Sequence, residues 1–140
     1  MAIFAVMLLG VYGVLGTGNA VISNDNALLD MQQQARNGLI RMVKELRQAS
    51  TVTISGASNN IVTFTIPTAS NIKYYLSTIN GVSYLVREYP AGTVKNISNN
   101  IAYLNFSLNS RLLTMKLRAD KLIYSKTVSF SLAENVRLRN

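Results

Sequence analysis

The chain opens with a stretch that carries no charge, and this stretch constrains the fold more than any other feature. From Met1 to Val21 there is no charged side chain, and residues 2–15 are apolar apart from Gly10, Tyr12 and Gly13. A helix that is apolar all round is not stable alone in water and has to lie in lipid or among neighbouring helices. The sequence therefore predicts a buried apolar helix over residues 1–22.

The side chains expected to be buried in this way are large and apolar. They are Ile3, Phe4, Val6, Leu8, Leu9, Val11, Val14 and Leu15. A run of this length is also typical of the hydrophobic part of a signal peptide, although no Lys or Arg precedes it. A small-x-small sequence at residues 16–18 keeps the possibility of cleavage open.

Residues 23–50 have the pattern of an amphipathic helix. Asn24 is a suitable N-cap, and Asp25 is favourably placed near the positive end of the helix dipole. Apolar residues at three- and four-residue steps form one stripe, which predicts packing of the helix on a sheet. The stripe contains Leu28, Met31, Ala35, Leu39, Met42, Val43 and Leu46. No proline occurs before Pro67, so one continuous helix is expected from Ala2 to Ala49.

After Ser50 the apolar period changes from that of a helix to that of a strand. Val62, Phe64 and Ile66 alternate with threonines, and Asn80-Gly81 separates two alternating runs in the manner of a type I′ hairpin. A second hairpin is expected between 101–108 and 111–118, joined at Asn109-Ser110, and a last strand over 127–132.

These elements predict an α+β fold. A long N-terminal helix, apolar in its first half and amphipathic in its second, would pack on a mainly antiparallel sheet. The expected organisation is an apolar segment 1–22, an amphipathic helix 23–50 and a β-rich head 51–140 that forms one domain with that helix.

The composition argues against an enzyme. The chain has no cysteine and no histidine, which removes thiolate metal sites, serine–histidine catalysis and most zinc or haem ligation. Its six acidic residues show no local pairing, so no catalytic, cofactor-binding or metal-binding residue is predicted. The net charge of +8 is compatible with an anionic partner, but the basic residues are scattered and not interleaved with aromatics.

Four stretches, in this order, resemble the type IV pilin-like proteins, and above all the minor pseudopilins of type II secretion and related minor pilins. They are the apolar start leading into "ARNGLIRMVKELRQAS", the hairpin "IKYYLSTINGVSYLVREY", the strand "NNIAYLNFSL" with the hairpin that follows, and the terminal "ENVRLRN". The family's basic leader and its Gly-Phe-Thr-Leu-x-Glu processing site do not occur here. Met1 to Val6 is similar to sequence just downstream of that site.

The resemblance implies a structural subunit of a type IV pilus or a type II secretion pseudopilus, initiating the filament or located at its tip. It implies anchoring in the cytoplasmic membrane, with the head outside the cytoplasm, and assembly with other pilin or pseudopilin subunits. Membrane lipid and secreted cargo are the further expected partners, with no cofactor and no small-molecule substrate. The alternative is a DNA-binding minor pilin of a DNA-uptake system that uses the basic surface.

Overall fold

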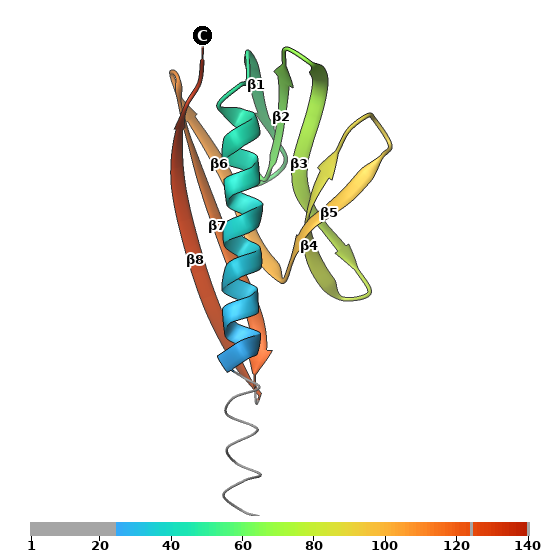
Figure 1. Ribbon diagram of the computed structural model, residues 1–140, viewed down its shortest axis with the longest axis vertical. Coiled ribbons are helices and arrows are strands. Elements are labelled where there is room, and N and C mark those ends of the chain that lie inside the picture. Colours follow the sequence, from blue (N-terminus) through green and yellow to red (C-terminus); the bar gives the residue numbers. More distant parts are fainter. Residues whose placement is uncertain (1–24, 124, 140) are drawn as a thin grey trace, which may run out of the picture. The chain divides into compact units, whose positions relative to one another are not determined.

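The computed structural model describes residues 25–123 and 125–139 (Figure 1). The chain divides into two compact units, Met1–Asp30 and Met31–Asn140. The described residues of the first unit, 25–30, are helical. Among the described residues of the second unit are the helical residues 31–46 and two antiparallel sheets. Strands make up 60% of the described residues, so this part of the chain is mostly β.

The prediction of an α+β fold built on a long N-terminal helix and one sheet is wrong. The described helix covers 22 residues, 25–46, and the strands form two separate sheets. The apolar residues 2–22, which were expected to form the first half of the long helix, lie outside the described residues.

The helix ends in a tightened turn that leads directly into the first strand. The backbone N–H groups of Gln48 and Ala49 donate to carbonyls three residues earlier, at 3.0 and 3.1 Å, and Ser50 then donates to the carbonyl of Thr65 at 2.9 Å. Residues 51–53 are β-branched and favour extended backbone. The strand that they begin was not among the strands predicted from the sequence.

The larger sheet is a meander of five strands in sequence order. Its strands are β1 (Thr51–Ser55), β2 (Ile61–Ile66), β3 (Ala69–Ile79), β4 (Val82–Glu88) and β5 (Val94–Asn99). Asn80 and Gly81 both have positive φ, 51° and 77°, and Ile79 pairs with Val82. A type I′ turn requires positive φ at both central residues, so the predicted hairpin is confirmed.

The smaller sheet has three strands, β6 (Ile101–Asn109), β7 (Leu112–Ile123) and β8 (Lys126–Arg137), in that order. The predicted second hairpin is confirmed, with its turn one residue later, because Asn109 pairs with Leu112. β8 is longer than expected: it pairs with β7 continuously from residue 126 to residue 137.

A single left-handed residue separates the two sheets. β5 ends at Asn99 and β6 begins at Ile101, and Asn100 between them has φ of 57°. Asparagine is among the few non-glycine residues that adopt this conformation readily. The chain turns a corner here, so the strand that follows joins a new sheet rather than extending the first.

Helical residues 31–46 pack against both sheets (Figure 1). On one side Gly38 approaches β4 and β5 so closely that an added Cβ would lie 3.0 Å from Leu85 Cδ2 and 3.3 Å from Ser98 Cβ. On the other side the Arg36 guanidinium lies over the Phe130 ring of β8, 5.7 Å from its centroid. The buried apolar side chains come from residues 31–136, from the helix and both sheets.

Candidate functional site

The eight apolar residues predicted to lie in a membrane or filament core all fall outside the described residues. They are Ile3, Phe4, Val6, Leu8, Leu9, Val11, Val14 and Leu15. Within 25–123 and 125–139, no helix combines the length and the apolar character needed to cross a bilayer.

The predicted helix stripe mostly points inward in the described structure. Met31, Ala35, Leu39, Met42 and Leu46 are buried, whereas Leu28 and Val43 are half-buried. Ile40, which the stripe did not include, is 64% exposed. Ile40 and the half-buried Val43 therefore leave apolar surface on the helix that the core does not cover.

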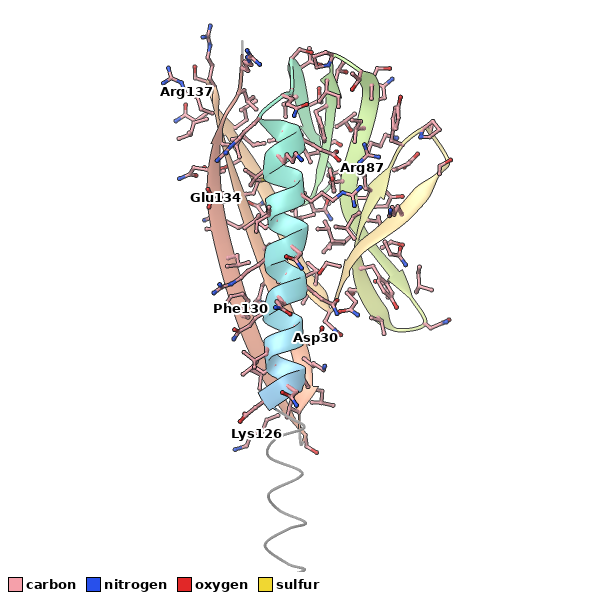
Figure 2. The ribbon with its side chains drawn as sticks, in the orientation of Figure 1. Asp30, Arg87, Lys126, Phe130, Glu134 and Arg137 are labelled. Carbon is pink, nitrogen blue, oxygen red and sulfur yellow. The ribbon has the colours of Figure 1, made fainter. Side chains whose placement is uncertain are left out.

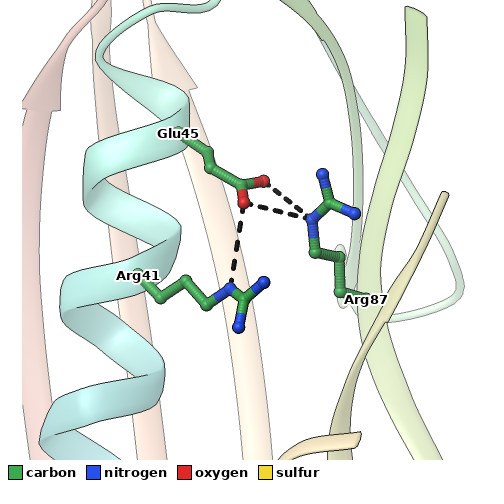
Figure 3. Close-up of polar contacts among 3 residues, drawn as sticks. All are labelled: Arg41, Glu45 and Arg87. Carbon is green, nitrogen blue, oxygen red and sulfur yellow. Dashed lines mark hydrogen bonds and ion pairs between the residues drawn. The ribbon is translucent and has the colours of Figure 1, made fainter. Parts of the chain in front are cut away.

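An ion-pair cluster ties the helix to the five-stranded sheet (Figure 3). The Arg87 Nε–H of β4 donates to both carboxylate oxygens of Glu45, at 2.9 and 3.1 Å, and both side chains are less than one-fifth exposed. Arg41 Nε lies 3.9 Å from the same carboxylate but is 42% exposed. Glu45 lies outside the predicted apolar stripe, and the helix pattern gives no sign of a partner on β4 for it.

Tyr74 lies beside this cluster. It is directly opposite Arg87 in the β3–β4 register, its ring stacks on Phe64 at 6.0 Å, and the residue is fully buried. Its hydroxyl makes no hydrogen bond to any described residue. Burial, and secondarily the negative charge of Glu45, raise the pKa of Tyr74 well above its ordinary value.

A groove of about 500 Å³ runs between the exposed side of the helix and β8. Its lining is Leu39, Ile40, Val43, Lys44, Arg47, Gln48 and Glu134. An apolar floor edged by two cations and one carboxylate is suited to contact with a protein segment. The sequence signal for it was Ile40, an apolar residue beside the main stripe.

The outer face of the three-stranded sheet is the second distinctive surface. Along β7, Leu113, Met115 and Leu117 are buried, so the alternate residues, Lys116 and Arg118, project from the opposite face. Tyr103 of β6 lies opposite Arg118 in register, and the guanidinium lies 6.0 Å from its ring centroid.

Lys116, Arg118 and Tyr103 line a hollow of about 320 Å³ on that face, together with Ser131 and Ala133 of β8. The basic run from residue 111 to residue 126 contains no aromatic apart from the tyrosine at 124. Strand pairing is what places Tyr103 beside it, and sequence spacing gave no sign of this.

The acidic side chains of the described structure do not cluster. Its His, Cys, Asp and Glu residues form no group of three or more that could hold a metal ion. The carboxylate of the ion-pair cluster, Glu45, pairs with Arg87. The groove and the outer face are the two surfaces of the described structure considered below as contact sites.

No protein-family model, no curated protein and no solved structure matches this chain at a significant level, so the function has to be argued from the chemistry of its own residues.

Proposed function

We propose that this protein is a minor subunit of a type IV pilus or a type II secretion pseudopilus, initiating the filament or lying at its tip. The observation that carries the proposal is the charge-free apolar stretch, which directly precedes an amphipathic helix belonging to a β-rich head. Fully burying one large apolar side chain stabilises by about 1.5–3 kcal/mol. Eight such side chains between Ile3 and Leu15 are enough to hold a subunit in lipid or among its neighbours.

The composition of the head core supports this use of the apolar stretch. The buried apolar side chains of the described structure lie between Met31 and Val136, and they include most of the main stripe of the helix. The described residues of the head thus form a core among themselves, and the proposal assigns residues 2–22 to contact with lipid or with other subunits. The groove beside Ile40 and the outer face around Lys116 are the surfaces available for neighbouring heads or cargo.

Membrane association of the full chain is the first test. We expect the wild-type chain to remain in the membrane fraction after alkaline extraction. A Leu9→Arg variant should be released to a greater extent than wild type, because a charge at the centre of an inserted segment costs about 2.5–3.5 kcal/mol. Leu122→Arg is the matched control, since Leu122 is 69% exposed on the head and its replacement should leave the chain in the membrane. Equal release of wild type and both variants would contradict the proposal.

Filament assembly is the second test. A photo-crosslinking residue at position 8 should capture pilin or pseudopilin subunits in a bacterium that assembles the filament, and the product should appear in sheared filaments. The same residue at position 122 is the control for accidental contact. Crosslinks to unrelated membrane proteins alone would show a membrane protein that is not a filament subunit.

The second candidate is DNA binding by a minor pilin, and the outer face of the three-stranded sheet favours it. Lys116 and Arg118 supply positive charge, and Tyr103 offers a ring on which a base can stack. Binding to labelled DNA should weaken steeply with salt. A Lys116→Ala/Arg118→Ala variant should lower the slope of log affinity against log salt by about 1.4–1.8, the equivalent of two phosphate contacts.

The control for this candidate removes the same charge elsewhere. Lys73 and Lys95 lie on the five-stranded sheet, and Lys73→Ala/Lys95→Ala should leave the salt slope near the wild-type value. Equal slopes for the two double variants would mean that only net charge matters. Absence of binding at low salt would eliminate this candidate.

A further inference from the structure

The free edge of β8 is the part of the described fold that most strongly indicates a partner. β8 forms one edge of the three-stranded sheet and pairs only with β7 among the described strands. It is 12 residues long, contains no proline and has no bulge. Long, regular edges of this kind present a row of unpaired backbone groups that can template pairing with another strand.

The opposite edge of the same sheet, formed by β6, is protected against pairing with another strand. β6 has a register shift between Ile101 and Tyr103. The loop before β2 covers it further, because Phe106 N donates to the Asn59 carbonyl at 2.8 Å and Asn105 Nδ2 donates to the Ser58 carbonyl at 2.8 Å. No backbone hydrogen bond outside the sheet involves residues 126–137 in the described structure.

The pattern of side chains along β8 indicates which strand could pair with it. On the face toward the helix, β8 carries alternately Lys126, Val128, Phe130, Leu132 and Glu134, all exposed or half-buried. Figure 2 shows Lys126, Phe130 and Glu134 following one another along the strand. Lys126 lies four residues before Phe130, and Glu134 lies four residues after it. Two copies of β8 that run antiparallel can therefore place each positive charge opposite a negative one.

We propose that β8 pairs antiparallel with β8 of a second copy of this chain, about a two-fold axis at Phe130. In this register Phe130 lies opposite Phe130 of the other copy, Val128 opposite Leu132, and Lys126 opposite Glu134. Aromatic, apolar and opposite-charge pairs directly across antiparallel strands are each stabilising. The two three-stranded sheets become one continuous sheet, and the interface is isologous, as a two-fold requires.

Other registers that keep the helix-side faces together lack this match. A shift of Lys126 to lie opposite Leu132 or Val136 removes both charge pairs and places a charge against an apolar side chain. Neither Lys126 nor Glu134 forms an ion pair with any described residue of its own chain. Each is therefore able to pair across the two-fold, and this inference does not rest on the proposed filament function.

Single-cysteine crosslinking of the full chain tests the register. The chain has no cysteine, so Phe130→Cys introduces a single thiol. Directly opposite residues in an antiparallel pair have Cα atoms about 4.5–5.5 Å apart, within the range of a disulfide. We expect Phe130→Cys in a mild non-ionic detergent to form a disulfide dimer on mild oxidation.

Thr127→Cys is the control on the same strand. Thr127 lies opposite Ala133 in the proposed register, so its two copies are about 20 Å apart along the strands and should not crosslink. Failure of Phe130→Cys to crosslink, or equal crosslinking at both positions, would overturn the proposal.

Charge reversal provides an independent test that preserves Phe130. Lys126→Glu and Glu134→Lys each convert two attractive pairs into two repulsive ones, which should weaken dimerisation at least about tenfold in sedimentation velocity. The double variant Lys126→Glu/Glu134→Lys restores both pairs in reversed order and should recover wild-type dimerisation. A monomeric wild-type chain, single variants that dimerise normally, or a double variant that stays weak would each refute the two-fold pairing.

Discussion

The ion pair between Glu45 and Arg87 should contribute measurably to the attachment of the helix to the five-stranded sheet. The perturbation is Glu45→Ala, which leaves the Arg87 side chain, only 16% exposed, without its carboxylate partner and beside the fully buried Tyr74. The Tyr89 ring, 5.4 Å from that guanidinium, remains as a weaker partner.

The size of the effect follows from the burial of the pair. Fully exposed ion pairs contribute about 0.2–1 kcal/mol, whereas removing one partner of a fully buried pair costs about 3–5 kcal/mol. Both side chains here are less than one-fifth exposed, and their Nε–O distances are 2.9 and 3.1 Å. Glu45→Ala should therefore lower the free energy of unfolding by about 2–3 kcal/mol, in the range of hydrogen bonds to charged groups.

A double-mutant cycle separates the interaction from the loss of side-chain packing. Unfolding by urea, followed by circular dichroism, would be measured for wild type, Glu45→Ala, Arg87→Ala and the double variant. We expect a coupling energy of about 1–2 kcal/mol, mostly retained at high salt because the pair is shielded from solvent. Arg41→Ala is the control and should change stability by less than about 0.5 kcal/mol, since its contact is longer and more exposed.

A coupling energy below about 0.3 kcal/mol would refute the reasoning, because it lies within the additivity expected of independent sites. The pair would then be no stronger than a solvent-exposed one, despite its burial. A full loss of coupling in salt would lead to the same conclusion.

Three further predictions test the packing of the core and the buried hydroxyl group of Tyr74. Met42→Ala should lower the free energy of unfolding in urea by about 2–5 kcal/mol, because Met42 is fully buried. Ile40→Ala, at a 64% exposed site, should change it by no more than about 0.5 kcal/mol. Similar losses of stability in both variants would contradict the assigned helix faces. Gly38→Leu should destabilise by about 1–3 kcal/mol through overpacking against Leu85, and an unchanged denaturation midpoint would show that the helix can move away. Burial raises the pKa of Tyr74 in the folded state, so on raising the pH the unfolded state loses the hydroxyl proton first, near pH 10. Above that pH the free energy of unfolding of wild type should fall by up to about 1.4 kcal/mol per pH unit relative to Tyr74→Phe. Parallel curves of stability against pH for the two proteins would contradict this prediction.

Local signals in the sequence were sufficient for the hairpins. Asn80-Gly81 has few alternatives to a type I′ turn, and the alternation on either side of Ser110 is strong, so both hairpins were predictable from residues close together in the chain. The apolar spacing of residues 31–46 likewise predicted a helix, because a period near 3.6 produces one apolar face.

The association surfaces were not predictable in the same way. Tyr103 and Arg118 are adjacent only because β6 and β7 pair in one register, and Ile40 and Glu134 line one groove only because the helix lies along β8. Spacing along the chain contains no information about which distant segments will meet. The strand β1 was missed for a related reason, since its residues 51–55 are stabilised by pairing with β2 rather than by a pattern of their own.

By itself, the sequence determined that the first 21 residues carry no charge, that an amphipathic helix follows, and that alternating strands with tight turns make up most of the remainder. These properties depend on residue type and local spacing, which act over a few residues. Tertiary structure alone decided that the strands divide into two sheets at Asn100, that Glu45 turns toward Arg87, and that β8 pairs with no described strand other than β7. Those outcomes depend on which surfaces, distant in the sequence, bury their apolar groups against one another. The choice among alternative packings is made only when the whole chain folds.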